Sequence, residues 1–312
     1  LEFRRVLFRS PDAMRWIWRG WPAAVRANPE GKSRQPVMDI FPAGSEWVLV
    51  SSGHKFTEGP TPTETGEIYF TDIPNNRIHK VGLDGRVTVF AEDTGAANGL
   101  KLGRDGWLYA CANAKKKITR YSPDGKVEDM ISDVESNDLV GALDGGYWTD
   151  PLNRKVWFAN VNGHRVVDTG IGFPNGIITS PDQSLLYVAD TKGQFVYSFQ
   201  IQPDGSLAHK QAYFHLRIPD GATDSGADGM TCDSQGRLYV TTRMGLQVCD
   251  QAGRVNAIIP KPHTGWLSNV CFGGPDLNEL YITCGDKVFK RKTKVKGVLT
   301  FKDPIKPAAP RL

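Results

Sequence analysis

A polar residue recurs six times along this chain at the start of a similar short phrase, and the spacing of these phrases strongly constrains the fold. The intervals between successive positions are 40, 39, 38, 53 and 41 residues. A period near forty that persists over five steps indicates one supersecondary unit repeated around a ring or along a stack. The six residues are Glu58, Asn98, Asn137, Asn175, Asp228 and Asn269.

Each phrase has the pattern of a strand, a turn and a second strand. The second strands are rich in β-branched and aromatic residues, as in Ile68–Phe70 and Leu186–Val188. Asp-Gly pairs at positions 84, 124 and 204 tolerate the positive φ that tight hairpin turns require. No stretch shows convincing helical periodicity. We therefore predict an all-β protein, a six-bladed β-propeller with four-stranded blades.

In a propeller the first strand of each blade lines the central channel, so the six polar side chains are expected to converge on the axis. The carboxylates of Glu58 and Asp228, with the amide oxygens of Asn137 and Asn175, suit one hard divalent cation. Ca²⁺ fits best because it takes many ligands in a tolerant geometry. None of the six positions is Cys or His, which argues against zinc. Zn²⁺, Mg²⁺ and Mn²⁺ are the alternative ions.

A purely structural interpretation of the same residues is that they form turns, because Asn-Gly and Asp-Gly are common at strand starts for backbone reasons alone. Glu58 argues against it, since Glu has no such turn preference. For Asn98 and Asn269 both interpretations stay open: either residue contacts metal, water or substrate, or lines the channel.

Several motifs together resemble the SMP-30/gluconolactonase/LRE-like family, which includes regucalcin and bacterial gluconolactonases. The resemblance runs from about Phe56 to Cys284, with the motifs in family order. The motifs are Glu58-Gly59-Pro60, Tyr69-Phe70-Thr71-Asp72, Ser136-Asn137-Asp138-Leu139, Pro174-Asn175-Gly176, Ala227-Asp228-Gly229 and Phe272-Gly273-Gly274-Pro275-Asp276.

The resemblance implies an axial divalent cation, usually calcium, held by Glu58, Asn137, Asn175 and Asp228. It also implies a hydrolase, because related propellers open sugar lactones or cleave organophosphate esters. We expect a lactonase acting on a sugar-type (aldono) lactone. The alternatives are a phosphotriester hydrolase on the same metal site and a non-catalytic calcium-binding propeller.

Asp228 is the candidate general base, which would orient or deprotonate the attacking water. Direct ligation to a cation would lower its pKa, so the alternative is that the metal acidifies the water and Asp228 only positions it. Asn98 and Asn137 are candidate substrate contacts. Glu135 is a third, because it stands two residues before the third-motif Asn, where some sugar-lactone members carry an Arg instead. Trp148, Phe173 and Trp266 either wall the pocket or pack between blades.

The chain divides into three segments by pattern. Residues 1–37 are rich in Arg and Trp without strand pattern, which indicates a non-native or disordered leader. Residues 38–300 form the propeller, with a strand at Trp47–Val50 expected to pair with the last blade and close the ring. Residues 301–312 are a C-terminal tail. The 53-residue interval contains segment 214–226, which we expect at the channel mouth.

The composition restricts the classes of partner that the chain is expected to bind. Of the chain's 38 basic and 34 acidic residues, residues 38–286 hold 21 and 30, a net charge of −9, which disfavours nucleic acid as a partner. No segment has the roughly 18 apolar residues of a membrane helix. The expected partner is a small-molecule lactone; the oligomeric state stays open.

The five cysteines occur singly, which indicates reduced core residues and favours a cytoplasmic location. Because the native start is uncertain, a periplasmic or secreted location is the alternative. The histidines form no metal-binding motif, and we predict that His54 and His263 lie in surface loops.

Overall fold

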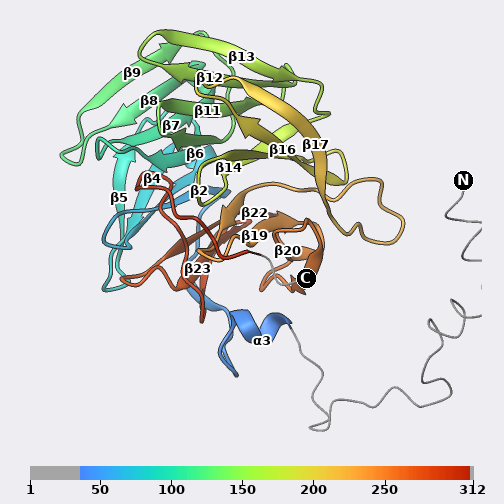
Figure 1. Cartoon of the computed structure of the whole chain (residues 1–312). Coiled ribbons are helices and arrows are strands. Elements are labelled where there is room, and N and C mark those ends of the chain that lie inside the picture. The colour runs from blue at the N-terminus through green and yellow to red at the C-terminus, as the bar shows by residue number, and fades with distance from the viewer. Residues whose placement is uncertain (1–35, 310–312) are drawn as a thin grey trace, which may run out of the picture. The chain divides into compact units, whose positions relative to one another are not determined.

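The computed structural model describes residues 36–309, which contain 24 strands arranged in six antiparallel sheets of four strands each. The sheets are the blades of a ring, and they follow one another in chain order (Figure 1). The structure is the predicted six-bladed β-propeller. Residues 1–35, which make up nearly all of the predicted leader, lie outside the described residues.

The first three blades take their strands from consecutive segments of the chain. Blade 1 comprises β2 (Thr57–Pro62), β3 (Ile68–Asp72), β4 (Arg77–Val81) and β5 (Val87–Glu92). Blade 2 comprises β6 (Ala97–Leu102), β7 (Leu108–Ala112), β8 (Lys117–Tyr121) and β9 (Val127–Ser132). Blade 3 comprises β10 (Leu139–Ala142), β11 (Gly145–Asp150), β12 (Lys155–Asn160) and β13 (Gly163–Thr169).

Blades 4 and 5 repeat this order, and blade 6 takes its outermost strand from the N-terminal part of the described chain. Blade 4 comprises β14 (Pro174–Thr179), β15 (Leu185–Asp190), β16 (Phe195–Ile201) and β17 (Leu207–His215). Blade 5 comprises β18 (Met230–Cys232), β19 (Leu238–Thr242), β20 (Gly245–Cys249) and β21 (Val255–Ile259). Blade 6 comprises β22 (Leu267–Gly273), β23 (Glu279–Cys284), β24 (Lys287–Lys292) and β1 (Val48–Ser51).

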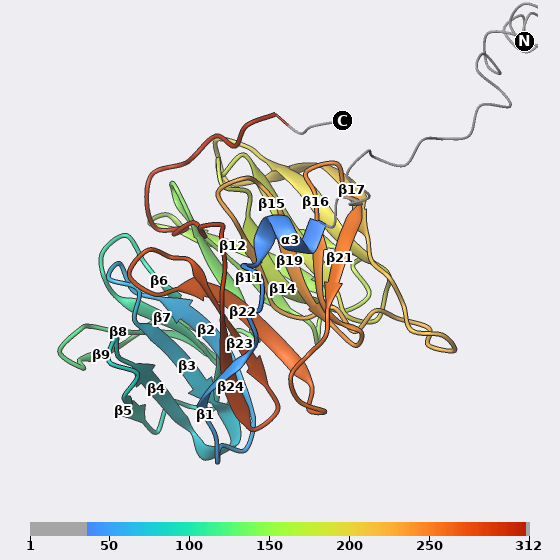
Figure 2. The ribbon, with the colours of Figure 1, turned by 90° about the horizontal axis from the view of Figure 1, so that it is seen from below.

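The ring closes by strand exchange between the two ends of the propeller. Strand β1 pairs antiparallel with β24, with Val48 opposite Lys290 and Leu49 opposite Phe289 (Figure 2). This pairing confirms the closure predicted from the sequence. Strand β1 is thus the fourth strand of blade 6, and it covers the edge of β24 that would otherwise be unpaired.

A short helix precedes β1, although the sequence showed no helical periodicity. Helix α3 (Pro36–Ile40) is a little over one turn long, which is too short for a hydrophobic period to be visible. Ile40 and Phe41 are buried against blades 5 and 6, and the Arg291 guanidinium lies 4.0 Å from the Phe41 ring centroid. The predicted boundary at residues 37 and 38 thus lies inside this helix. Among the described residues, no helix is long and apolar enough to cross a membrane.

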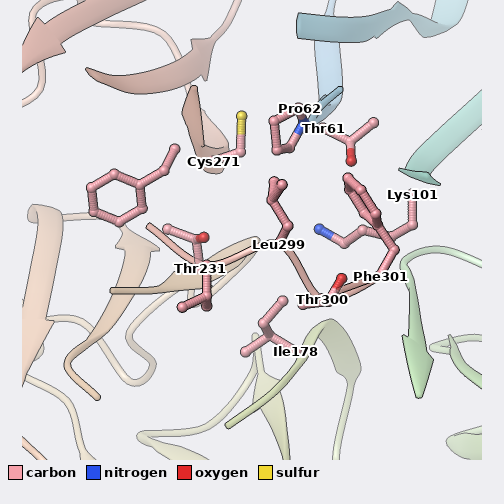
Figure 3. Close-up of a pocket in the computed structure, with 11 residues that line it drawn as sticks. Thr61, Pro62, Lys101, Ile178, Thr231, Cys271, Leu299, Thr300 and Phe301 are labelled. Carbon is pink, nitrogen blue, oxygen red and sulfur yellow. The ribbon is translucent and has the colours of Figure 1, made fainter. Parts of the chain in front are cut away.

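Residues 293–305 cross one end of the central channel. Val298–Phe301 lie against the later residues of five innermost strands, with Leu299 and Lys101 at the centre (Figure 3). Gln183 Nε2 donates to the carbonyls of Thr300 and Lys302 at 3.1 and 3.0 Å. The chain therefore packs on the propeller beyond residue 300, where the tail was expected to begin.

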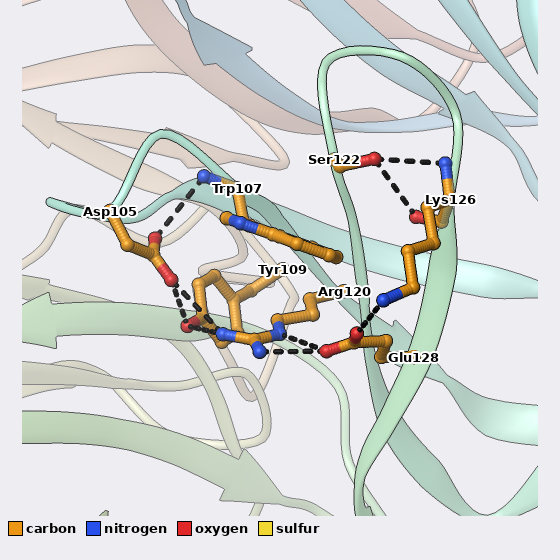
Figure 4. A network of polar contacts seen from close by, with 7 residues as sticks. All are labelled: Asp105, Trp107, Tyr109, Arg120, Ser122, Lys126 and Glu128. Atoms are coloured by element: carbon orange, nitrogen blue, oxygen red, sulfur yellow. Dashed lines mark hydrogen bonds and ion pairs between the residues drawn. The ribbon is translucent and has the colours of Figure 1, made fainter.

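The blades pack through buried apolar side chains, and all five cysteines are free and buried, as predicted. The outer part of blade 2 carries instead a polar network across β7, β8 and β9 (Figure 4). Arg120 is its centre: it donates to Glu128 Oε2 at 2.7 and 3.0 Å, and its guanidinium lies 4.3 Å from the Trp107 ring. Asp105 accepts from Tyr109 Oη and Arg120 at 2.8 and 3.2 Å.

Candidate metal centre

Hydroxyl groups on the second strands link the innermost strands of neighbouring blades at the level of the repeated polar residues. Thr71 Oγ1 donates to the carbonyl of Asn98 at 3.1 Å, and Thr149 Oγ1 donates to that of Asn175 at 2.7 Å. Thr191, just after β15, and Thr241 on β19 form similar bonds to blades 5 and 6, and Ser268 Oγ, on the innermost strand β22, joins blade 6 to blade 1. The backbone that carries the polar residues is therefore fixed from blade to blade.

Three buried carboxylates lie at the level of the repeated polar residues. Glu58, Asp138 and Asp228 are 4, 7 and 7% exposed. The Asn269 side chain connects two of them, because its Nδ2 donates to Glu58 Oε2 at 2.9 Å and to Asp138 Oδ2 at 3.2 Å. Asn269 Oδ1 accepts from the Val270 amide at 2.9 Å. Asn269 thus holds two acidic side chains from blades 1 and 3 at the axis.

Asp138 was not among the predicted site residues. In four of the six phrases the residue after the repeated polar residue is glycine, whereas blade 3 has Asp138 there. A Cβ at Gly99 would collide with the Asp138 carboxylate, and one at Gly229 would collide with the Asn269 amide. The neighbouring glycines therefore make room for these two side chains. The replacement of Gly by Asp in one phrase is the signal by which the sequence could have revealed Asp138.

Both predicted carboxylate ligands have one oxygen engaged by a protein donor. Gly59 N and Asn269 Nδ2 both donate to Glu58 Oε2, at 2.5 and 2.9 Å. Trp266 Nε1 donates to Asp228 Oδ2 at 2.7 Å. Each of these donors contacts one oxygen of its carboxylate and so fixes the orientation of that side chain.

The two buried amides also have a free oxygen. Asn175 Nδ2 donates to Thr191 Oγ1 at 3.1 Å, while Asn175 Oδ1 is buried without a hydrogen-bond partner among the described residues. Asn98 Oδ1 is in the same state. A buried amide oxygen without a donor is unfavourable by about 1–3 kcal/mol. Such an oxygen is therefore suited to bind an ion, a ligand or a water.

The carboxylates repel one another and are poorly solvated. Burial raises the pKa of Glu58 well above its usual range, and the charges of Asp228 and Asp138 raise it further. Burial raises the pKa of Asp228 to about 8 and that of Asp138 to about 6. A cation at this position would reverse these shifts by stabilising the ionised forms. The donor set, consisting of oxygens alone, fits a hard cation such as Ca²⁺.

Two further predicted residues are less closely integrated with the axial cluster. Asn137 is half-buried, and its backbone rather than its side chain connects the blades: its N donates to the Thr149 carbonyl, and its carbonyl accepts from Gly99 N at 2.9 Å. The Glu135 carboxylate forms an ion pair with Lys116 Nζ at 2.8 Å.

Trp266 connects the axial cluster to the loop predicted at the channel mouth. The Arg243 guanidinium lies 5.1 Å from its ring centroid, and Arg243 Nε donates to Asp224 Oδ1 at 2.8 Å. Arg243 N donates to the Ser225 carbonyl at 2.9 Å. The loop that ends the 53-residue interval thus contacts the residue that orients Asp228.

The structure places the other two predicted aromatic residues and His54 in different surroundings. Trp148 is buried and stacks on Trp157 with 5.5 Å between ring centroids, so it packs within blade 3. Phe173 has Lys192 Nζ 4.8 Å from its ring centroid. The prediction that His54 is a surface residue is wrong: its side chain is only 8% exposed, because the loop carrying it folds over Asp72 and Phe70.

Known proteins resemble this chain in sequence and in fold. A profile of the SMP-30/gluconolactonase/LRE-like region matches residues 56–286. A gluconolactonase of Zymomonas mobilis is 24% identical, over 80% of this chain and 82% of that protein. The pentonolactonase XacC of Haloferax volcanii is 25% identical, over 75% of this chain and 83% of that protein.

Solved structures share the fold. A putative gluconolactonase superposes with a TM-score of 0.76 at 24% identity, covering 86% of this chain and 99% of its own. A regucalcin from Agrobacterium tumefaciens, described as a calcium-binding protein, superposes with a TM-score of 0.70 at 18% identity, covering 85% and 97%. The family profile spans well over half of the sequence. The chain therefore belongs to the SMP-30/gluconolactonase/LRE-like family.

Proposed function

We propose that this protein is a divalent-cation-dependent hydrolase that opens a sugar-type (aldono) lactone. The observation that carries the proposal is that two buried amide oxygens without a donor among the described residues, Asn98 Oδ1 and Asn175 Oδ1, occur at the same repeat position as the buried carboxylates of Glu58 and Asp228. Its support from related proteins is that the curated relatives include a gluconolactonase and a pentonolactonase.

The cation would be held by Glu58, Asn175 and Asp228, three of the four ligands predicted from the sequence, and Ca²⁺ is the ion that the oxygen donors favour. We add Asp138 to the set, because its buried carboxylate shares Asn269 with Glu58. The half-buried Asn137 would serve as a ligand or as a substrate contact. When bound, the cation would polarise the lactone carbonyl and stabilise the negative charge that develops on its oxygen.

Asp228 is suited to handle the proton of the attacking water. Trp266 holds its Oδ2, so Oδ1 has a defined position from which to accept a hydrogen bond. The water oxygen bonds to the carbonyl carbon, Asp228 takes its proton, and the ring C–O bond breaks. The leaving alkoxide then receives the proton, which yields an open-chain hydroxy acid whose carboxyl group ionises at neutral pH.

The remaining residues would bind the sugar. Asn98 and Asn137 offer amide groups for the ring hydroxyls, and both lie at the same repeat position as the metal ligands. Glu135 would accept hydrogen bonds from hydroxyls only after releasing Lys116, with which it is paired. A substrate with several hydroxyls would use these contacts better than an alkyl lactone.

Hydrolysis of a lactone panel tests this proposal. The panel would contain five- and six-membered aldonolactones, an alkyl lactone and a phosphotriester, assayed by proton or phenol release with Ca²⁺ and then with chelator. We expect the highest kcat/KM with an aldonolactone, loss of turnover with chelator, and loss in Asp228→Asn. The matched control is Asp105→Asn, which removes a carboxylate from the outer network of blade 2. Tight Ca²⁺ binding without any turnover would contradict the proposal and indicate a binding propeller.

A further inference from the structure

A second group of possible metal ligands lies apart from the axial cluster, where the ring closes. His54 is in the connection between β1 and β2, Asp72 ends β3, and His79 is on β4. One ligand atom from each of the three side chains lies within 4.8 Å of those of the other two. Their side chains are all buried, with exposures of about 8, 2 and 8%.

The distance between His54 and Asp72 suits a shared ion. His54 Nδ1 lies 3.3 Å from Asp72 Oδ2, which is longer than the 2.7–2.9 Å that is typical of charge-assisted hydrogen bonds. Two ligands of a tetrahedral ion at about 2.0–2.1 Å are separated by about 3.3–3.4 Å. The pair therefore already has the spacing of one edge of a tetrahedral site.

The surroundings of the pair resemble those of metal-binding imidazoles. His54 Nε2 lies 2.7 Å from Ser51 Oγ, which can accept a hydrogen bond from Nε2–H and so leave Nδ1 as the ligand atom. Asn75 Nδ2 donates to Asp72 Oδ2 at 2.7 Å, and the amides of Lys55 and Phe56 donate to Oδ1. The carboxylate is thereby held in place beside His54.

His79 is the independent sign of a missing partner. Its Nε2 is buried and has no hydrogen-bond partner among the described residues. The ring stacks on Phe70 and meets His54 edge-on, with ring centroids 5.1 and 4.8 Å apart. A buried, unsatisfied imidazole nitrogen beside a second imidazole and a carboxylate is an unfavourable arrangement that a bound cation would relieve.

The histidines are additions to the repeat rather than part of it. Asp150 and Asp190 end the second strands of blades 3 and 4, as Asp72 does in blade 1. In the strand register, Trp157 and Tyr197 occupy the place of His79. The repeat can therefore bury this aspartate without any histidine, so the blade 1 pair needs its own explanation.

We propose that His54, Asp72 and His79 bind one borderline transition-metal ion of the Zn²⁺ class, separate from the axial cation. Two imidazoles and one carboxylate suit Zn²⁺ rather than Ca²⁺, and a water would complete a tetrahedral set. A shift of His79 toward the other two ligands closes the site. The ion would join the connection that follows the closing strand β1 to strands β3 and β4, and so brace the ring where the two ends of the propeller meet.

Cobalt provides a direct probe of this site. The full chain is freed of metals, its axial site is saturated with Ca²⁺, and Co²⁺ is added while the visible spectrum is recorded. We expect one equivalent of Co²⁺ to give the strong visible absorption of a four-coordinate ion. Zn²⁺ should displace it and raise Tm by several degrees, because a ligand bound only to the folded state stabilises that state.

Substitutions locate the ion. His79→Gln and His54→Gln should each abolish the cobalt spectrum and the zinc-dependent rise in Tm, with Ca²⁺-dependent lactone hydrolysis retained. His215→Gln is the control, because His215 is exposed on β17. Cobalt absorption that persists in both cluster variants, or no tetrahedral spectrum in the unmodified chain, would overturn the proposal. The cluster would then be a hydrogen-bonded Ser51–His54–Asp72 array.

Discussion

Trp266 Nε1 donates a 2.7 Å hydrogen bond to Asp228 Oδ2, which links a mouth residue to the candidate base. The indole has a single donor, so this bond fixes which carboxylate oxygen is engaged. Arg243 covers the same indole and pairs with Asp224. The orientation of Asp228 is thus coupled to the loop that ends the longest interval of the repeat.

Trp266→Phe tests this coupling. The variant keeps an aromatic ring and removes the donor together with part of the indole, so it should fold normally. Because hydrogen bonds to charged groups contribute about 1.5–3 kcal/mol, we expect kcat to fall by about 10- to 100-fold with a smaller change in KM. Steady-state lactone hydrolysis measures both constants. Trp107→Phe, in the outer network of blade 2, is the control, and an unchanged kcat in Trp266→Phe would show that Asp228 needs no orientation by the indole.

Asp138→Asn tests the third carboxylate. Removing one of three mutually repelling acids should raise the Tm of the calcium-free protein at pH 8, since an amide can still accept from Asn269. The same change should weaken Ca²⁺ binding by at least about tenfold, because one charge of the site is lost. Calorimetry with and without Ca²⁺ measures both effects. A lower Tm together with unchanged Ca²⁺ affinity would mean that Asp138 is structural only.

The pH dependence of stability has a defined sign. Asp228 and Asp138 have pKa values of about 8 and about 6 in the calcium-free fold, above the ordinary value of 3.8. The folded state therefore binds more protons than the unfolded state between about pH 4 and 8, and stability falls as pH rises through that window. Each group contributes at most about 1.4 kcal/mol per pH unit.

Thermal unfolding at pH 5 and pH 8 measures this effect. We expect the chelated protein to have the lower Tm at pH 8, and Ca²⁺ to raise Tm more at pH 8 than at pH 5, because the cation binds the ionised carboxylates. In Asp228→Asn the dependence should be weaker. A chelated protein whose Tm rises steadily from pH 5 to 8 would contradict the presence of buried, mutually repelling acids at the axis.

Truncation tests ring closure. A chain that begins at Met38 retains Ile40, Phe41 and the whole of β1, so we expect unchanged Tm and activity. A chain that begins at Ser52 lacks β1 together with the buried Ile40 and Phe41, and it exposes the edge of β24. We expect its Tm to fall by about 10 °C or more, since several kcal/mol of strand pairing and burial are lost. Equal Tm values for the two chains would show that closure by β1 contributes little.

The repeat was readable because each blade uses the same strand pattern and the same polar residue at the same place. Glu58 and Asn175 are the second residues of β2 and β14, and Asp228 lies two residues before β18, so their positions near the start of innermost strands followed from the period alone. Closure by Trp47–Val50 followed from the geometry of a ring, in which a blade without a partner strand would leave an edge exposed.

Other features depend on contacts that no local pattern expresses. Asp138 reaches the axis only because Gly99 and Gly229 in neighbouring blades leave room for it and for Asn269. The His54 side chain is buried because the amides of Lys55 and Phe56, which follow it, donate to the Asp72 carboxylate at the end of β3. Residues 293–305 have no periodicity, yet they cover one end of the channel through contacts with several blades.

Calcium titration of activity tests the central claim most directly. Chelator-treated protein is supplied with increasing Ca²⁺, and lactone hydrolysis is followed by proton release while Ca²⁺ binding is measured by calorimetry on the same sample. We predict that activity saturates with the binding of one equivalent at the axial site, with one dissociation constant for both signals, and that Asp228→Asn loses both. Full turnover in excess chelator would contradict the account.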